Sequence, residues 1–272
     1  MKTHQVTGGG GVRLHAVETG NPSGRPILFI HGFSQSWLAW TRQLESDLAD
    51  TFRLVALDLR GHGFSDKPRD AYGDSKLWAD DIHAVIQKLE LAQPVLVGWS
   101  YGPLVILDYI RHYGEDAIRG AAFVGGITKL GSEEAAAVLT AEFVGAVPGF
   151  FSNDVEQSVR TADSLLRLCF EDRLTPQEHY QMLGYNMAVP PYVRQGLLSR
   201  ALNNDDLLPK LRKPVLVVQG ADDPVVKPIV IEQQMARIPR AQVRIVPKAG
   251  HACFWLDAPG YNRWLREFVG AL

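Results

Sequence analysis

Short apolar runs separated by longer amphipathic stretches set the pattern of this chain of 272 residues. Three of these runs are short and mainly apolar, which is typical of strands buried on both faces of a parallel sheet: Ile27–Ile30, Leu54–Asp58 and Val95–Val97. Before the third run, apolar residues from Trp78 to Leu89 recur at helical spacing, which predicts a helix lying on a sheet. Alternation of this kind predicts an α/β fold with a mostly parallel sheet and helices on both of its faces.

The same alternation extends to both ends of the chain. The further elements that we predict are strands over residues 3–7, 12–18, 118–124, 215–219 and 243–246, helices over residues 37–49, 104–113 and 229–238, and a last amphipathic helix that carries residues 261–268. Parallel strands joined by right-handed crossovers place their ligands at the carboxyl ends of the strands. We therefore look for chemistry in the loops that follow the strands.

The pattern changes between residues 127 and 206, where apolar residues recur at helical spacing and no strand-like run occurs. The helices predicted there are Glu133–Val144, Asp154–Cys169 and Pro176–Met187, broken by Pro148-Gly149 and by Pro190-Pro191. A helical insertion between two strands of a parallel sheet predicts a cap that excludes water from the strand ends and shapes a pocket. The expected organisation is one discontinuous α/β core, residues 1–126 and 207–272, with a helical cap formed by residues 127–206.

A Gly-x-Ser-x-Gly motif, Gly98–Gly102, joins the apolar run that begins at Val95 to the helix that follows. A sharp turn from strand to helix strains its central residue, and the flanking glycines let strand and helix pack closely. The hydroxyl of Ser100 is then lifted clear of the sheet edge. We interpret Ser100 as a nucleophile on such a turn.

A reactive serine needs an imidazole within hydrogen-bond reach and a carboxylate that holds the imidazole. His251 follows the last predicted strand and provides the base. The acid is expected after the strand that ends at residue 219, where Asp222 and Asp223 are adjacent; neighbours on an extended segment point opposite ways, so only one reaches His251. We choose Asp223 and keep Asp222 as the alternative. The other place for an acid, after residue 124, holds Gly125-Gly126.

Two backbone N–H groups are candidates for stabilising an oxyanion. Tyr101 begins the helix after the nucleophile, where the helix dipole is positive, and Phe33 lies in the loop after the strand that ends at Ile30. His31 is expected to brace this loop, and His62 and His83 are interpreted as structural. The remaining early histidines, His4 and His15, are expected on the surface of a sheet.

Composition and charge favour a small-molecule partner. The chain is 46% hydrophobic with a net charge of −2, so it shows neither the basic field that binds nucleic acid nor a polybasic membrane patch. The two cysteines lack metal-ligand spacing, and Gly61-x-Gly63 lacks the third glycine of a dinucleotide motif, so we expect no metal and no cofactor. The N-terminus lacks the apolar segment of a signal peptide and no stretch is long enough to span a membrane, which favours a cytoplasmic protein.

Taken together, these motifs resemble the α/β-hydrolase family over essentially the whole chain. The matching segments are residues 31–33, 58–65, 98–102, 220–226 and 250–251. The resemblance implies a mostly parallel eight-stranded sheet with a helical cap between the sixth and seventh strands. It also favours Asp223 over Asp222, because the acid of the family usually stands three residues after the glycine at position 220.

The resemblance leaves several activities open. Ser100 argues against haloalkane dehalogenases and epoxide hydrolases, which use aspartate at that position. The chain is similar to α/β-hydrolase-type acyl-homoserine-lactone lactonases in size, in the turn Gly98–Gly102 and in the stretch Phe151–Glu156. Haloperoxidase-like relatives, in contrast, usually have Gly-Gly where this chain has Gly102-Pro103. We expect a serine hydrolase of carboxylic esters or lactones with an apolar acyl or aromatic part, N-acyl-homoserine lactones among them. The alternatives are a perhydrolase-type esterase, a carbon–carbon bond hydrolase, a lyase using the same triad and a non-catalytic receptor.

Overall fold

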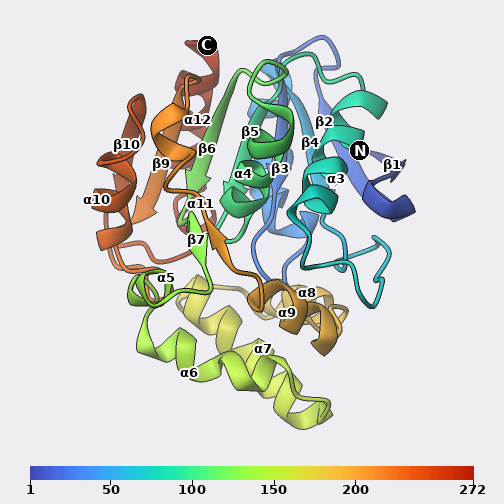
Figure 1. The fold of residues 1–272 in the computed structure, drawn as a ribbon, viewed down its shortest axis with the longest axis vertical. Coiled ribbons are helices and arrows are strands. Elements are labelled where there is room, and N and C mark those ends of the chain that lie inside the picture. Colours follow the sequence, from blue (N-terminus) through green and yellow to red (C-terminus); the bar gives the residue numbers. More distant parts are fainter.

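A sheet of eight strands forms the centre of the computed structural model, which describes all 272 residues (Figure 1). The order across the sheet is β1-β2-β4-β3-β5-β6-β9-β10, and every neighbouring pair is parallel except β1–β2 and β2–β4. The strands are β1 Lys2–Thr7, β2 Arg13–Gly20, β3 Pro26–Ile30, β4 Arg53–Asp58, β5 Val95–Trp99, β6 Gly120–Val124, β9 Val215–Gly220 and β10 Ala241–Val246. This arrangement confirms the predicted mostly parallel α/β sheet. Strands β3, β5 and β6 are buried throughout, which is why their sequences are apolar without alternation.

Helices cover both faces of the sheet. The helices that belong to the core are α1 Thr41–Leu44, α2 Leu48–Thr51, α3 Ser75–Lys88, α4 Gly102–Tyr113, α10 Ile229–Met235, α11 Cys253–Leu256 and α12 Ala258–Gly270. Helices α3 and α4 pack against each other, while α12 contacts α1 and α11. Three single turns of 3₁₀-helix lie at Gly9–Gly11, Trp37–Trp40 and Leu208–Lys210. None of the helices is both long and apolar enough to cross a membrane.

The helix predicted over residues 37–49 is wrong as a single element. The chain instead forms the 3₁₀ turn Trp37–Trp40, then α1 and α2, with the helical path interrupted after Leu44. The hydroxyl of Ser46 donates to the carbonyl of Gln43 and accepts from the N–H of Leu48. Serine hydroxyls offer the backbone such alternatives to helical bonds, and the apolar spacing alone does not reveal them.

Five helices, which we call the cap helices, lie together beyond the carboxyl ends of the parallel strands (Figure 1). They are α5 Glu133–Ala137, α6 Ala141–Phe150, α7 Val155–Phe170, α8 Pro176–Met187 and α9 Pro191–Leu198. The single helix predicted over residues 133–144 is two helices, because the Thr140 hydroxyl accepts from the N–H of Phe143 and starts α6 afresh.

One of the two predicted proline breaks is confirmed and the other is wrong. Helix α8 ends at Met187 and α9 begins at Pro191, so Pro190-Pro191 separates the two helices, whereas Pro148 lies inside the last turn of α6. Proline suits the first helical position because its missing N–H would have no partner there. The absence of strands from this segment is also wrong in detail, since Lys129–Leu130 (β7) and Leu202–Asn203 (β8) form a two-residue antiparallel ladder where the chain enters and leaves the cap helices.

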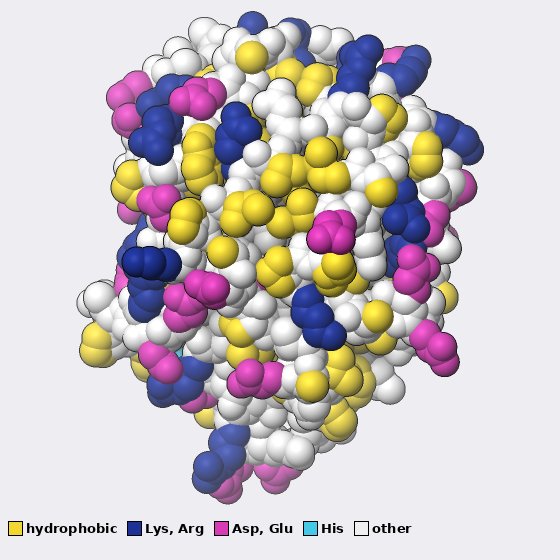
Figure 2. Space-filling model, turned by 90° about the vertical axis from the view of Figure 1, so that its left-hand side faces the viewer, with side chains coloured by type: hydrophobic (Ala, Val, Ile, Leu, Met, Phe, Trp, Pro, Cys, Tyr) yellow, Lys and Arg dark blue, Asp and Glu magenta, His cyan; other side chains and the backbone are white.

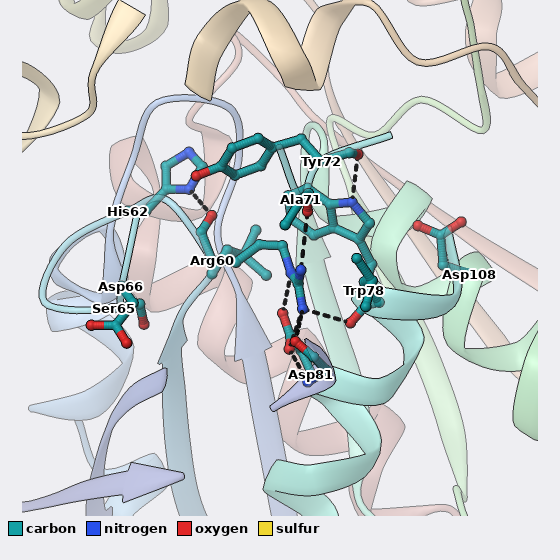
Figure 3. A network of polar contacts seen from close by, with 12 residues as sticks. Arg60, His62, Ser65, Asp66, Ala71, Tyr72, Trp78, Asp81 and Asp108 are labelled. Atoms are coloured by element: carbon teal, nitrogen blue, oxygen red, sulfur yellow. Dashed lines mark hydrogen bonds and ion pairs between the residues drawn. The ribbon is translucent and has the colours of Figure 1, made fainter. Parts of the chain in front are cut away.

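A buried ion pair fixes the glycine-rich loop after β4. Arg60 donates from Nε and Nη2 to the two carboxylate oxygens of Asp81, at 2.7 Å each, and neither side chain is exposed. The guanidinium also donates to the carbonyls of Gly9, Ala71 and Leu77. Figure 3 shows Arg60 between Asp81 and Ala71. All three guanidinium nitrogens of Arg60 therefore donate to partners inside the protein.

Strand β10 ends the sheet, and its outer edge has no neighbouring strand. Figure 2 looks onto this side of the molecule and shows hydrophobic side chains interspersed with charged ones of both signs. Ile229, Met235 and Ile245, the exposed large apolar residues of α10 and β10, belong to this edge. Charges beside an edge strand discourage pairing with another sheet.

Candidate active site

Ser100 occupies a strained turn between β5 and α4. Its φ of 57° lies in the left-handed region that non-glycine residues rarely adopt. The turn closes so tightly that a Cβ on Gly98 would lie 2.6 Å from the backbone carbon of Gly102, and one on Gly102 would lie 2.6 Å from the carbonyl oxygen of Ile30. Glycine at both positions is therefore needed to hold Ser100 at the carboxyl edge of the sheet.

His251 and Asp223 form a buried pair beside this turn. His251 Nδ1 lies 2.9 Å from Asp223 Oδ2, and the two residues are 1% and 5% exposed. An ionised carboxylate can only accept, so Nδ1 carries the hydrogen and Nε2 of the neutral ring is free to accept a proton. Asp222 is exposed, and its N–H donates to the carbonyl of Ala249. The structure thus brings Asp223 to His251, and not its neighbour.

Three donors other than His251 hold the Asp223 carboxylate. Oδ1 accepts from the N–H groups of Val225 and Val226, at 2.8 and 2.9 Å, and Oδ2 accepts from Gln219 Nε2 at 2.7 Å. These bonds fix the carboxylate in the orientation that meets the imidazole. Sequence reasoning missed Gln219, although a polar residue at the end of an otherwise apolar strand, 215–219, was the available signal.

Gly125 and Trp99 position the imidazole from the other side. A Cβ on Gly125 would lie 3.1 Å from the carbonyl oxygen of His251 and 3.2 Å from its Nδ1, closer than Cβ atoms usually approach, and the φ of 51° also favours glycine. The close contact and the backbone conformation both disfavour an acid at Gly125. Trp99 Nε1 donates to the carbonyl of His251 at 3.1 Å, and the two rings lie 5.5 Å apart. Trp99 is a further positioning residue that the sequence analysis did not assign.

Both candidate oxyanion donors have unused backbone N–H groups. Neither Phe33 nor Tyr101 donates its N–H to another group of the protein, although both residues are buried, at 7% and 2% exposure. Buried N–H groups are almost always paired, so two unpaired ones beside one serine indicate a place prepared for an acceptor. Such donors stabilise an oxyanion when they point to the position where its charge develops.

The loop that carries Phe33 is held from both ends. His31, as expected, braces it: Nδ1 bonds to the carbonyl of Gly32 at 2.8 Å, and Nε2 accepts from the N–H of Leu59 at 3.1 Å. On the cap side, Arg194 Nε of α9 donates to the hydroxyl of Ser34, whose φ of 61° is also left-handed. Tyr101, the other candidate oxyanion donor, is also held from α9, because its hydroxyl donates to the carbonyl of Leu197.

Ser100 lines two small cavities, whose walls also share Phe33, Phe143 and Val225. The histidine cavity, about 20 Å³, has walls that include His251, Trp99 and Gln35. The apolar cavity, about 30 Å³, is lined by hydrophobic side chains except at Ser100 itself. No hydrogen bond joins Ser100 to His251 in this structure, and catalytic hydrogen bonds often tighten only when substrate binds. Both candidate residues nevertheless face the same enclosed space.

Other reactive side chains near the cavities are less suited to chemistry. Cys169 lines the histidine cavity, but burial raises the pKa of its thiol well above the ordinary value, and the charge of Asp223 adds to the rise. A thiol of this kind is protonated at neutral pH. No three histidine, cysteine, aspartate or glutamate side chains converge into a group that could hold a metal ion.

The other predicted structural histidines lie away from Ser100. His62 is buried against His31, with ring centroids 4.9 Å apart, and His83 stacks on Tyr113. The expectation that His15 lies on a sheet surface is wrong, because its Nδ1 bonds to the buried carboxylate of Asp58 at 2.9 Å and the side chain is 14% exposed. The loop after β4 folds over that side chain and covers it.

Comparison with known proteins identifies the fold family. The sequence pattern of the alpha/beta hydrolase fold matches residues 25–258. The crystal structure of the esterase RhEst1 from Rhodococcus sp. ECU1013 is 34% identical and covers all of both chains with a TM-score of 0.94. The non-heme chloroperoxidase CPO-A1 of Kitasatospora aureofaciens is 28% identical over 90% of this chain and 92% of its own.

A lactonase has the same fold at lower identity. The structure of the N-acyl homoserine lactonase AidH with N-butanoyl homoserine is 24% identical, with a TM-score of 0.84 over 99% of this chain and 96% of its own. At this identity the likeness concerns the fold, and substrate does not follow from fold.

Proposed function

The chain belongs to the α/β-hydrolase fold family, and we propose that it is a serine hydrolase that cleaves carboxylic esters through Ser100, His251 and Asp223. One observation carries the proposal. The His251 ring is bonded on one nitrogen to a buried carboxylate, while its other side opens to a cavity that it shares with a serine in a strained turn. This is the arrangement that activates a serine hydroxyl.

Acylation begins when the Ser100 hydroxyl attacks the ester carbonyl and passes its proton to Nε2 of His251. The carbonyl oxygen becomes an oxyanion and accepts from the N–H groups of Phe33 and Tyr101. The imidazolium then gives its proton to the leaving alkoxide, so the alcohol departs neutral and the acyl group stays on Ser100. Asp223 keeps the proton of Nδ1 in place and stabilises the transient positive charge.

Deacylation repeats these steps with water as the nucleophile. His251 takes a proton from water, the hydroxide attacks the acyl carbonyl, and the same two N–H groups hold the oxyanion. The proton then returns from His251 to the Ser100 oxygen as the carboxylic acid is released. Each turnover consumes one ester and one water and yields one acid and one alcohol.

Esters are better supported than homoserine lactones as substrates. The esterase that covers the whole chain is 34% identical, whereas the lactonase comparison supports the fold alone. The apolar cavity, at about 30 Å³, has room for about two water-sized groups, which favours a short acyl chain. N-acyl homoserine lactones carry an amide and a longer chain in that position.

Perhydrolysis is the second candidate, and the similarity to a non-heme chloroperoxidase over most of both chains favours it. Hydrogen peroxide would replace water in deacylation, so the acyl-enzyme would yield a peracid and free Ser100. The reaction would use the same residues. It would show as oxidation of a halide that depends on both acetate and peroxide.

A pH-stat panel tests the proposal. The substrates are short-acyl esters, plain lactones, N-acyl homoserine lactones and acetate with peroxide, each measured with the wild type and with Ser100→Ala. We expect ester hydrolysis above the other activities and a loss of about ten-thousandfold or more in the variant. Ester hydrolysis that survives Ser100→Ala would show that another residue is the nucleophile.

A further inference from the structure

A groove of about 400 Å³ lies on the surface between cap helix α8 and the loops that follow β3 and β4. On the core side its walls include Trp37, Leu38 and Phe64, and Phe64 is 71% exposed. On the cap side they include Gln181, Gly184 and Tyr185, which repeat along one side of α8. The apolar surfaces of both sides face the same opening, and no segment of this chain fills it.

A hydrogen bond links a residue that lines this groove with a residue that lines the histidine cavity. Tyr185 lines the groove, Gln35 lines the cavity with His251 and Ser100, and the Tyr185 hydroxyl donates to Gln35 Oε1 at 3.0 Å. Both side chains are buried, at 7% and 1% exposure. The Gln35 side-chain nitrogen has no hydrogen-bond partner in the protein, so it is available to a polar atom in the cavity.

A second surface hollow near the histidine cavity is harder to connect to that cavity. It contains about 310 Å³ and lies beside Leu166 and Phe170 of α7, whose neighbours Leu165 and Cys169 line the histidine cavity. A path from there would require α7 itself to move, because the helix forms the wall. The path through Tyr185 and Gln35 requires two side chains to part.

The chemistry of the proposed hydrolysis decides which part of the ester lies on which side. His251 protonates the leaving oxygen, so the alcohol part must lie on the histidine side of Ser100. The acyl part then occupies the apolar cavity, which contains neither His251 nor Gln35. Because the groove adjoins the histidine cavity, it adjoins the alcohol part.

Resting on the proposed function, we infer that the groove is the binding site for the alcohol part of the substrate. We infer also that the hydrogen-bonded pair Tyr185 and Gln35 controls access to it from the histidine cavity. The substrate class is a short-acyl ester of a large, apolar alcohol. The acyl group is limited by the cavity of about 30 Å³, while the alcohol extends past Gln35 into the groove of about 400 Å³. Tyr185 and Gln35 part when the alcohol enters.

Two ester series of matched reactivity test this assignment. Acetates of ethanol and of 2-(2-naphthyl)ethanol change only the alcohol, and ethyl esters from acetate to octanoate change only the acyl group. We expect kcat/KM to rise with the size of the alcohol and to fall with the length of the acyl chain. The opposite order in both series would overturn the assignment.

The variant Phe64→Ala tests whether the groove binds the alcohol part of the ester. The ratio of kcat/KM for the naphthylethyl acetate to that for ethyl acetate should fall about tenfold, because a large part of an aromatic contact is lost. Tyr180→Ala is the matched control: Tyr180 lies on α8, is 79% exposed and does not line the groove, so both rates should stay unchanged. An unchanged ratio in Phe64→Ala would contradict the groove as binding site.

Leu198→Ala tests the other end of the substrate. Leu198 lines the apolar cavity, and shortening it should raise the rate for ethyl hexanoate relative to ethyl acetate severalfold. The same change should leave the preference for the large alcohol as it is. If instead the alcohol preference moved and the acyl preference did not, the two cavities would be assigned the wrong way round.

Binding of the product alcohol separates this inference from the proposed function. Fluorescence titration with 2-(2-naphthyl)ethanol needs no catalysis, and its Kd should rise about tenfold in Phe64→Ala but not in Tyr180→Ala. Tight binding without hydrolysis of any ester would refute the esterase proposal and leave the groove. Ester hydrolysis without binding that depends on Phe64 would refute the groove and leave the esterase.

Discussion

Asp81 and Asp223 are both buried aspartates that contact a basic side chain at the carboxyl side of the sheet. Only the partner of Asp223 lines a cavity. Both oxygens of the Asp81 carboxylate and all three guanidinium nitrogens of its partner Arg60 are hydrogen-bonded to protein groups. Asp223 is held just as firmly, yet its partner His251 uses one nitrogen and turns its other side to a cavity. A polar network that is complete stabilises the fold, whereas one with an unused group facing a cavity is available for chemistry.

Asp223→Asn should have the largest effect, on activity. The amide at this position no longer enforces the proton on Nδ1, so kcat for ester hydrolysis should fall about ten-thousandfold. The variant should stay folded, since Val225 and Val226 keep an acceptor. The measurement is kcat for ethyl acetate beside a urea unfolding curve. A variant that loses stability but keeps kcat would place Asp223 with Asp81 as a structural residue.

Asp81→Asn should show the reverse behaviour. Removing one charge of a buried pair leaves Arg60 uncompensated, which should lower the free energy of unfolding by about 3–5 kcal/mol. Activity per folded molecule should remain near that of the wild type at temperatures where the variant is folded. Asp80→Asn, at the adjacent and partly exposed position, should cost no more than about 1 kcal/mol. Equal losses in the two variants would contradict the role given to the Arg60–Asp81 pair.

The buried pair His31 and His62 should make the protein sensitive to acid. Burial lowers the pKa of both rings below the ordinary value of 6.5, that of His62 more strongly. Below pH 6.5 the two rings are therefore protonated in the unfolded chain but stay neutral in the folded one. The free energy of unfolding that is present above this pH is lost as the pH falls. Each histidine adds a slope of up to about 1.4 kcal/mol per pH unit.

Urea unfolding between pH 5 and pH 8 measures this slope, and His62→Leu should reduce it. A free energy of unfolding that is flat below pH 6.5 would show that the two rings accept protons in the folded state.

Asp222→Asn should have the smallest effect. Asp222 is exposed next to Asp223, and its N–H donates to the carbonyl of Ala249 at 3.1 Å. Both kcat and the free energy of unfolding should stay within error of the wild type, because surface substitutions of this kind usually change stability by no more than about 0.5 kcal/mol. A large loss of kcat would reopen the choice between the two aspartates.

The sequence predicted the parts of the site that depend on strand ends. Ser100, Asp223 and His251 each follow a different apolar run, and the carboxyl ends of parallel strands meet at one edge of the sheet. The helix over 37–49 could not be predicted as it is, because a local bond of Ser46 outweighs the apolar spacing. The groove could not be predicted at all, since it depends on how α8 packs over distant loops.

Supporting residues were harder to find than candidate catalytic ones. Gln219 and Trp99 act on Asp223 and His251 through contacts between residues far apart in the fold, and nothing in the local sequence pairs them. In the sequence Gly125 indicates only that an acid is missing after β6, yet a side chain there would crowd the His251 ring. Chemistry-bearing residues have local signals, whereas the residues that orient them depend on tertiary packing.

Covalent labelling tests the central claim, that Ser100 is the nucleophile, most directly. An aryl dialkyl phosphate transfers its phosphoryl group to an activated serine and is not readily released, so peptide mass spectrometry locates the reacting residue. The label should appear once, on Ser100, and should be absent from Ser100→Ala and slow to form in Asp223→Asn. A wild type that stays unlabelled, or a label on any other residue, would contradict the account.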